Sequence, residues 1–226
     1  MQVVYVGKRY FSFVLLPFIL FALTFAAQEA KPALAGKIII LDAGHGGIDT
    51  GASRSGVMEK DINLAVALQL KTILNQQGAK IVLSRETDTE LSTECDNEQI
   101  RGRYHRDLAA RVELAGESDA DLFISIHSNA AGNTKRHGAE AFYYAESESG
   151  KVLATTILTE LRKITHTPPS ANPGDYFVLR RSIITAALIE IGYISNPEER
   201  QLLQTADYQR KLAETIAAGI CNYYLQ

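Results

Sequence analysis

The sequence predicts an α/β fold in which a mostly parallel sheet is covered by helices on both faces. Apolar runs such as 37–42 (KIIILD) and 186–192 (AALIEIG) lack the polar alternation of a half-exposed strand, which indicates strands buried on both sides. Helical patterns separate these runs, as they do in parallel sheets. With 226 residues, of which 46% are hydrophobic and 22% charged, the chain is long enough to bury such a core.

The first predicted strand, 37–42, leads into a glycine-rich turn, and a helix is predicted at 60–77. Apolar side chains recur every four residues along that helix and therefore share one face; they are Ile62, Val66, Leu70 and Leu74. Gly78 is expected to end the helix, because glycine commonly follows a last helical turn. The apolar run 79–84 (AKIVLS) then predicts the second strand.

Residues 85–104 are polar and irregular, so we expect a surface loop there. A helix is predicted at 105–116, where apolar residues recur at three- and four-residue intervals. The apolar runs 121–127 (DLFISIH) and 138–144 (GAEAFYY) predict two more strands.

The remaining elements follow the same alternation. A helix is predicted at 147–165, a loop at 168–175 (PPSANPGD), a short strand at 176–180 (YFVLR) and a buried strand at 186–192. Two helices at 197–203 and 206–224 complete the predicted fold.

Residues 1–27 differ in composition from the rest of the chain. Lys8 and Arg9 are their only charged residues, and the 17 residues from Phe11 to Ala27 carry no charge, which predicts an export signal. This run is long for the core of a cleaved signal peptide and short for a membrane span, so a signal peptide and a signal anchor both remain open. Either one places the rest outside the cytoplasm, secreted or membrane-anchored. We expect a linker at 28–36 and the functional domain at 37–226.

Charge and cysteine content narrow the possible partners. The net charge of −3 provides no basic surplus to neutralise phosphates, which excludes nucleic acid as the expected partner. Cys95 and Cys221 are too few to form a disulfide framework, and the sequence leaves open whether they pair.

Four ionisable residues stand where ligands bind in open α/β sheets, beyond the carboxyl ends of strands. His45 lies among glycines after the first strand, His127 ends the third, and Glu190 is the only charged residue in the last. Glu59 begins the helix after the glycine turn. Three of them also have an ordinary explanation. His45 fits a solvated loop histidine, Glu59 an acid that interacts with the helix dipole, and His127 a hydrogen-bonded core histidine. A buried acid such as Glu190 must instead be neutral, paired or near a cation.

Two histidines and a carboxylate at one sheet edge match a catalytic zinc site, which leaves the fourth position to water. A further carboxylate beside that water can act as a general base. The contiguous HExxH motif is absent, so a thermolysin-type site is not predicted. On the residues alone, a metal-dependent hydrolase is therefore one hypothesis among several.

Four segments carry a more specific pattern: IIILDAGHGGIDTGA, MEKDINLAVALQLKTILNQQGAKIVLSRETD, RVELAGESDADLFISIHSNA and LIEIGYISNPEE, in this order. Over about residues 37–224 the chain resembles the zinc-dependent N-acetylmuramoyl-L-alanine amidases of the amidase-3 group, which cleave bacterial peptidoglycan. The resemblance implies a mixed, mainly parallel six-stranded sheet flanked by helices on both faces. It also implies one Zn²⁺ per chain, bound by His45, Glu59 and His127, with Glu190 as the catalytic residue of an amidase domain at 37–226.

The short N-terminal segment, the bare catalytic domain and the loop 92–104 resemble the spore-cortex amidases of endospore formers. That resemblance implies removal of peptides from muramic acid before muramic-δ-lactam forms, on the cortex side of the forespore, and it leaves a protein activator open. Ala43 and Thr185 stand where the family often has proline, and both changes affect loop stiffness rather than metal ligands.

Three further residues are weaker candidates. Asp42 is placed to support the second nitrogen of a ligand histidine, although a turn acid at a strand end fits equally. Arg180 is a candidate to bind a peptide carboxylate, although a solvated surface arginine is the alternative. Asn129 is a candidate to line the cleft.

Other functions remain compatible with these residues. A zinc peptidase or sugar deacetylase acting on the same wall polymer would use a similar site. A catalytically inactive wall-binding domain is a third hypothesis, and the retained Glu190 argues against it.

Overall fold

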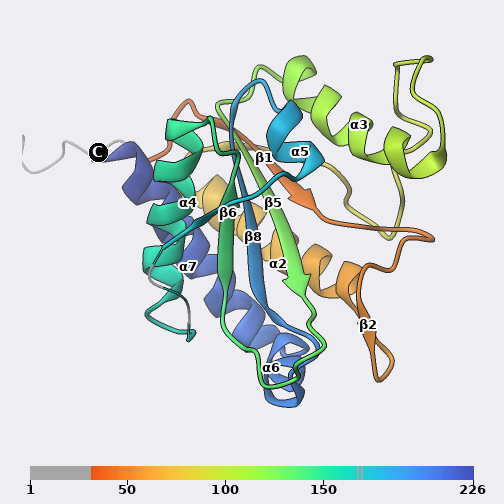
Figure 1. The fold of residues 1–226 in the computed structure, drawn as a ribbon. Helices are drawn as coiled ribbons and strands as arrows, with labels where there is room; N and C mark the ends of the chain where they lie inside the picture. Colours follow the sequence, from red (N-terminus) through yellow and green to blue (C-terminus); the bar gives the residue numbers. More distant parts are fainter. Residues whose placement is uncertain (1–31, 167, 169) are drawn as a thin grey trace, which may run out of the picture. The chain divides into compact units, whose positions relative to one another are not determined.

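The computed structural model describes residues 32–166, 168 and 170–226, and a six-stranded sheet lies at its centre (Figure 1). In spatial order the strands are β4 (Lys80–Leu83), β1 (Ile38–Ala43), β5 (Leu122–Asn129), β8 (Thr185–Tyr193), β6 (Glu140–Tyr143) and β7 (Asn172–Pro173). β1 pairs in parallel with β4 and β5, and β5 pairs in parallel with β8, whereas β6 is antiparallel to β8. The predicted mixed, mainly parallel six-stranded sheet is confirmed.

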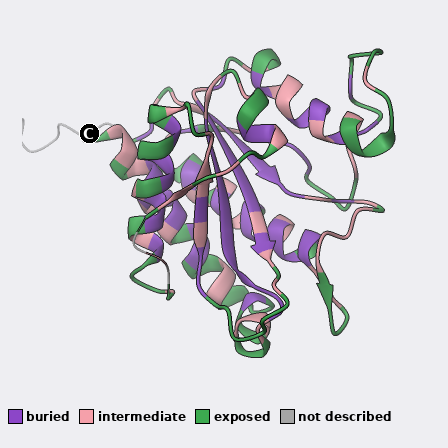
Figure 2. Cartoon of the chain, in the orientation of Figure 1, coloured by how far each residue is buried: buried purple, intermediate pink, exposed green. Residues whose placement is uncertain are grey.

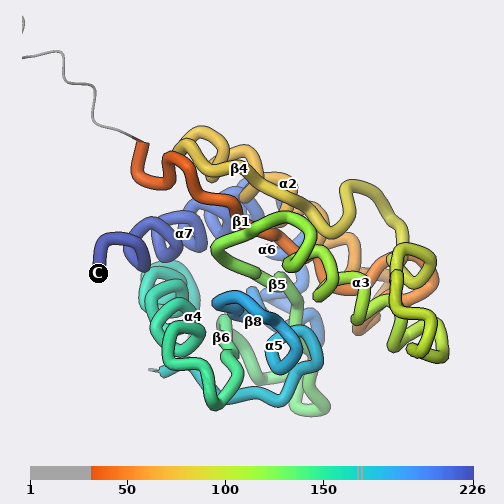
Figure 3. The backbone as a smooth tube through the Cα atoms, turned by 90° about the horizontal axis from the view of Figure 1, so that it is seen from above, coloured from red at the N-terminus to blue at the C-terminus, as the bar shows by residue number. Residues whose placement is uncertain are grey.

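Helices cover both faces of this sheet, as predicted. They are α2 (Glu59–Gln76), α3 (Arg103–Glu117), α4 (Glu148–Leu161), α5 (Phe177–Arg181), α6 (Pro197–Leu203) and α7 (Ala206–Tyr224). Ile39 and Leu41 of β1 pack in the core beneath α2, α4 and α7, whereas Ile40 packs beneath α3 and α5. Successive strand side chains point to opposite faces, so one continuous apolar run fills both layers. Figure 2 shows that most of the central strands are buried, and Figure 3 shows α4 and α7 on one side of the strands and α3 and α5 on the other.

The prediction of a strand at 176–180 is wrong, because these residues enter the short helix α5. The carbonyl of Tyr176 accepts hydrogen bonds from the amides of Leu179 and Arg180, which closes a helical turn. Val178 and Leu179 are both buried against the sheet. A five-residue apolar run fits a strand or a helix equally well, and here a single helical turn buries both side chains.

Two short pairings were not predicted. β2 (Ser53–Arg54) and β3 (Val57–Met58) form a small antiparallel hairpin ahead of α2. β7 lies within the predicted loop 168–175 and pairs with β6 through Asn172 and Pro173. Strands of two residues carry no hydrophobic period, so the sequence offers little signal for them.

The packed domain begins earlier than the predicted boundary at residue 37. Leu34, expected in the linker, is fully buried in the core, and its amide donates to the carbonyl of Gln77 at 2.9 Å. The described part of the predicted linker is therefore a turn packed against the end of α2. The predicted export signal at 1–27 and residues 28–31 lie outside the described residues. None of the helices in the described part of the chain combines the length and the apolar character that a bilayer span needs.

Cys95 and Cys221 are both free thiols. Cys95 is buried against Ala109 and Ala110 of α3, whereas Cys221 lies on α7. These helices cover opposite faces of the sheet, so the two cysteines do not pair.

Candidate metal and catalytic site

Three of the predicted residues come together at the carboxyl edge of the parallel strands. His45 follows β1, Glu59 is the first residue of α2, and His127 lies near the end of β5. Each offers one ligand atom, and these atoms all lie within 4.8 Å of one another. Glu59 Oε1 is 3.2 Å from His45 Nε2 and 2.9 Å from His127 Nδ1. The two imidazole rings meet edge to face, 4.9 Å apart between centroids.

This donor set suits a zinc ion. Zinc binds histidine nitrogen and carboxylate oxygen at about 2.0–2.2 Å in a tetrahedral arrangement, which separates ligand atoms by roughly 3.3 Å. The distances from Glu59 Oε1 to the two rings are close to that separation. The side chains of His45 and His127 are 23% and 18% exposed, so the cluster is open on one side. The three residues therefore form a possible metal site with room for a further ligand.

His45 is oriented by Asp49 rather than by Asp42. Asp49 Oδ2 is 2.9 Å from His45 Nδ1, which leaves Nε2 facing Glu59. Asp42 instead accepts hydrogen bonds from Arg111 at 2.5 Å and from Ser125 Oγ at 2.7 Å. Asp42 lies two residues after Ile40 and shares its face of β1, toward α3. The expected role of Asp42 as partner of a ligand histidine is therefore wrong, and Asp49 is the residue that the sequence analysis missed.

Two buried arginines fix the loop that carries His45. Arg111 donates to the carbonyls of Ala43 at 3.0 Å and His45 at 2.9 Å. Arg85 donates to the carbonyls of Ala43 at 2.9 Å and Gly44 at 3.1 Å. The backbone of His45 has a φ of +62°, which residues other than glycine rarely adopt. These four hydrogen bonds hold three successive carbonyls and stabilise that unusual conformation.

Glycine is required where the loop passes closest to the ligand side chains. A Cβ atom at Gly44 would lie 2.3 Å from ring atoms of His127. At Gly51, where φ is +61°, it would lie 2.6 Å from both Glu59 Oε2 and His45 Cδ2. The absence of a side chain at these two positions therefore allows the two histidines and Glu59 to approach one another.

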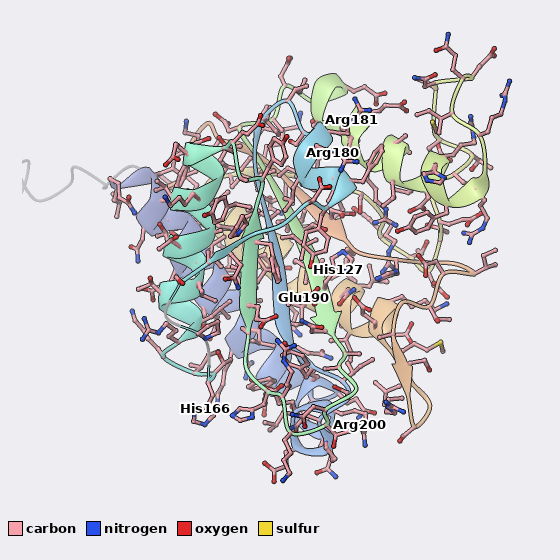
Figure 4. All side chains as sticks on the ribbon, viewed as in Figure 1. His127, His166, Arg180, Arg181, Glu190 and Arg200 are labelled. Carbon is pink, nitrogen blue, oxygen red and sulfur yellow. The ribbon has the colours of Figure 1, made fainter. Side chains whose placement is uncertain are left out.

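Glu190 lies beside this cluster on the neighbouring strand. It is paired in register with His127 across β5 and β8, and Figure 4 labels both residues. Its side chain is buried, and Oε2 has no hydrogen-bond partner among the described residues. Burial is the main reason that its pKa rises to about 7; the negative charges of Glu59 and Glu140 add to the effect, and His127 opposes it. Glu190 can therefore exchange a proton near neutral pH.

The electrostatics of the cluster favour positive charge. Burial opposes protonation of His45, but hydrogen bonds to and the charges of Glu59 and Asp49 outweigh it and raise the pKa of His45 to about 9. Burial likewise opposes ionisation of Glu59, yet the two histidines hold the pKa of Glu59 well below its usual value. The ionised carboxylates next to the imidazole nitrogens thus make this a place where a cation is stabilised.

A cavity of about 580 Å³ opens onto all four residues. Asn129 and Arg180, the two weaker substrate-binding candidates, both line it. Asn129 Nδ2 donates to Glu140 at 3.0 Å, and Arg180 forms an ion pair with Asp175. Two exposed aromatic residues that the sequence analysis did not single out, Tyr104 and Tyr176, also line the cavity. The sequence does not reveal which aromatic side chains are exposed, so it gave no reason to single these two out.

The fold and the site together define a class of protein. Two histidines and a carboxylate converge at the open edge of an α/β sheet, and a glutamate that titrates near neutral pH shares their cavity. Such an arrangement is typical of metal-dependent hydrolases.

Comparison with known families identifies the particular group. Residues 39–222 match the amidase-3 family, described as N-acetylmuramoyl-L-alanine amidase. The chain belongs to this family of enzymes.

Curated relatives and solved structures support the assignment. The chain is similar to the germination-specific N-acetylmuramoyl-L-alanine amidase of Bacillus subtilis, with 40% identity over 95% of this chain and 92% of the relative. It is 32% identical to the N-acetylmuramoyl-L-alanine amidase AmiA of Escherichia coli, over 87% of this chain and 79% of the relative. Among solved structures, the CwlD amidase from Clostridioides difficile, in complex with the GerS lipoprotein, is 39% identical with a TM-score of 0.77. That match covers 83% of this chain and 98% of the solved chain.

Proposed function

We propose that this enzyme is a zinc-dependent hydrolase of the amide bond between the lactyl group of N-acetylmuramic acid and L-alanine in peptidoglycan. His45, Glu59 and His127 hold one Zn²⁺ per chain, and Glu190 is the catalytic acid and base. The observation that carries this proposal is the convergence of the three ligand atoms within 4.8 Å of one another. Beside them lies a carboxylate oxygen of Glu190 that has no hydrogen-bond partner among the described residues.

A zinc ion supplies a Lewis acid for the amide carbonyl and lowers the pKa of water to about 7 when bound. Glu190 accepts the proton of the attacking water and then gives it to the leaving nitrogen of L-alanine. A pKa near 7 suits both roles, because the carboxyl group must gain and lose the proton in one cycle. Asp49 keeps the ring of His45 in the orientation that leaves Nε2 toward the metal.

We place this activity on the spore cortex, outside the cytoplasm. The support is similarity: the Bacillus subtilis relative is a germination-specific amidase, and the chain is 40% identical to it. In this role the enzyme strips peptides from muramic acid, and a deacetylase then acts on the exposed sugar to yield muramic-δ-lactam. Residues 1–27 direct the chain across the membrane, as a cleaved signal or an anchor.

A protein partner is part of the proposal. The CwlD amidase from Clostridioides difficile was solved in complex with a lipoprotein, and this chain matches it at 39% identity. We propose that a protein partner likewise acts with this enzyme on the outer side of the membrane. Asn129 and Arg180 contact substrate in the cavity they line.

Mass spectrometry of muropeptides from digested sacculi tests the reaction. The proposal predicts free L-alanine amines on released peptides and intact lactyl carboxylates on the glycan, and it predicts that a zinc chelator abolishes both products. Released acetate would identify a deacetylase, and cleavage within the peptide a peptidase. Zinc binding without release of any peptide or acetate would instead indicate a non-catalytic wall-binding domain. Each of these three outcomes contradicts the proposal.

A further inference from the structure

The side chain of Asn63 lies between the three segments that carry the proposed zinc ligands. Asn63 is on α2, one helical turn after Glu59, and is fully buried. Its Nδ2 donates to the carbonyl of Gly44, next to His45, at 3.2 Å, and to Glu59 Oε1, also at 3.2 Å. Its Oδ1 accepts a hydrogen bond from Ser128 Oγ, next to His127, at 2.9 Å. One amide group thus joins all three segments.

Packing alone does not require an amide at this position. Asn63 lies on the buried face of α2, where its neighbours Val66, Ala67 and Leu70 are apolar and fully buried. Burying an amide is unfavourable unless its polar atoms find partners. Here both N–H groups and the carbonyl oxygen have partners, and each partner belongs to a ligand-bearing segment. The polar residue therefore has a more specific role than filling the core.

The contacts of Asn63 also define where the carboxylate of Glu59 lies. Glu59 Oε1 accepts from Asn63 Nδ2 and from the amide of Ser128 at 3.1 Å, and it is the same oxygen that faces both imidazole rings. Glu59 Oε2 accepts from the amide of Ala52 at 2.8 Å. The carboxylate is thus fixed in one orientation before any ion binds, which reduces the entropy lost on binding.

We propose that Asn63 is a positioning residue that sets the mutual spacing of His45, Glu59 and His127 and thereby the affinity of the site for zinc. The inference rests on the proposed zinc site. It concerns a residue that lies outside the ligand set and has no expected contact with substrate, since Asn63 does not line the cavity.

The zinc dissociation constant of the full chain tests this inference, measured by competition with a zinc-binding chromophore. Loss of a residue that orients metal ligands typically weakens metal binding 10- to 100-fold. We expect a weakening of about that size for Asn63→Ala. Asn75→Ala is the matched control, because Asn75 is exposed on the same helix, and we expect it to leave the dissociation constant unchanged.

Thermal unfolding of the metal-free proteins separates positioning from a purely structural role. A folded Asn63→Ala protein with a lower unfolding temperature but wild-type zinc affinity would overturn the inference. If Asn63→Ala does not fold, Ser128→Ala takes its place, because it removes only the hydrogen bond to Oδ1. Weaker zinc binding by Ser128→Ala supports the inference, and unchanged binding overturns it. If the wild-type chain binds no zinc, that result contradicts the proposed function itself.

Discussion

At the scale of single residues, the two carboxylates of the site have opposite environments. Glu59 accepts hydrogen bonds from Asn63, Ser128 and Ala52, and the two histidines hold its pKa well below the usual value. Glu190 is buried with one oxygen unpartnered among the described residues, and its pKa rises to about 7. Environments that separate two carboxyl pKa values in this way also suit them to different roles. We propose that Glu59 stays ionised as a metal ligand and that Glu190 transfers protons.

Replacing Glu190 by glutamine tests the proton-transfer role directly. Glu190→Gln keeps the shape of the side chain and removes its ability to exchange a proton. We therefore expect normal zinc content and a kcat reduced roughly 10²- to 10⁴-fold, measured on soluble muropeptides with zinc determined in parallel. Glu190 must be ionised to accept a proton, so wild-type kcat should rise with pH through its pKa. That pKa is about 7 without metal, and a nearby cation lowers it.

Glu214→Gln is the matched control for this substitution. Glu214 is exposed on α7 and does not line the cavity that holds Glu190. We expect it to retain most of the activity. A Glu190→Gln enzyme within a few-fold of wild type would exclude Glu190 from the mechanism.

At the scale of elements, a buried ion pair joins β1 to α3 next to the loop that carries His45. Arg111 and Asp42 are 2% and 1% exposed, and the same guanidinium group holds the carbonyls of Ala43 and His45. Burial opposes ionisation of Asp42, but the charge of Arg111 and the hydrogen bond from Ser125 outweigh it, and the pKa of Asp42 lies below its usual value. The pair therefore stabilises β1, α3 and the loop between their ends.

This lowered pKa predicts how stability changes with pH. A depressed pKa means that the contribution of Asp42 is fully present above about pH 4, the unfolded value, and is lost as the pH falls through the folded value. Asp42→Asn removes one of two buried carboxylates that pair with Arg111, and Asp107 remains at 2.8 Å from the guanidinium group. We therefore expect a loss of roughly 3 kcal/mol at pH 7, the low end for a broken buried ion pair. We also expect a smaller further loss in acid than for wild type. Urea unfolding of the metal-free protein between pH 2 and 7 measures both.

Asp207→Asn provides the comparison, because Asp207 pairs with Arg210 on the exposed surface of α7. Screening by solvent makes that pair weak, so little change is expected. Equal destabilisation by the two substitutions would contradict the account of β1 and α3.

The sequence predicted the elements that have a strong period and missed those that depend on their surroundings. β1, β5 and β8 were predicted because long apolar runs in an α/β chain are buried strands. The segment of α5 was predicted as a strand because five residues are too few to distinguish the hydrophobic period of a helix from that of a strand.

The same limit applies to the site. His45, Glu59, His127 and Glu190 were identified because each stands at the end of an element or interrupts an apolar one, and family resemblance added their roles. Asn63 was missed because a single polar residue on a helix gives no sign of partners 19 and 65 positions away. Asp49 was missed because the orientation of the loop, fixed by buried arginines, decides which acid meets the ring of His45.

At the scale of the whole molecule, parallel topology explains why distant segments share one site. β1, β5 and β8 are adjacent and parallel, so their carboxyl ends lie at the same edge and bring residues 45, 127 and 190 together. Helix α2, which follows β1 and the β2–β3 hairpin, begins at that edge with Glu59. We propose that this edge binds one zinc ion through two histidines and a carboxylate.

X-ray absorption at the zinc edge, combined with elemental analysis of the same sample, tests that claim most directly. We predict one zinc per chain, surrounded only by nitrogen and oxygen at about 2.0–2.2 Å, with the outer-shell scattering of two imidazole rings. A protein that binds no zinc, or a zinc ion with sulfur at about 2.3 Å from Cys95 or Cys221, would contradict it.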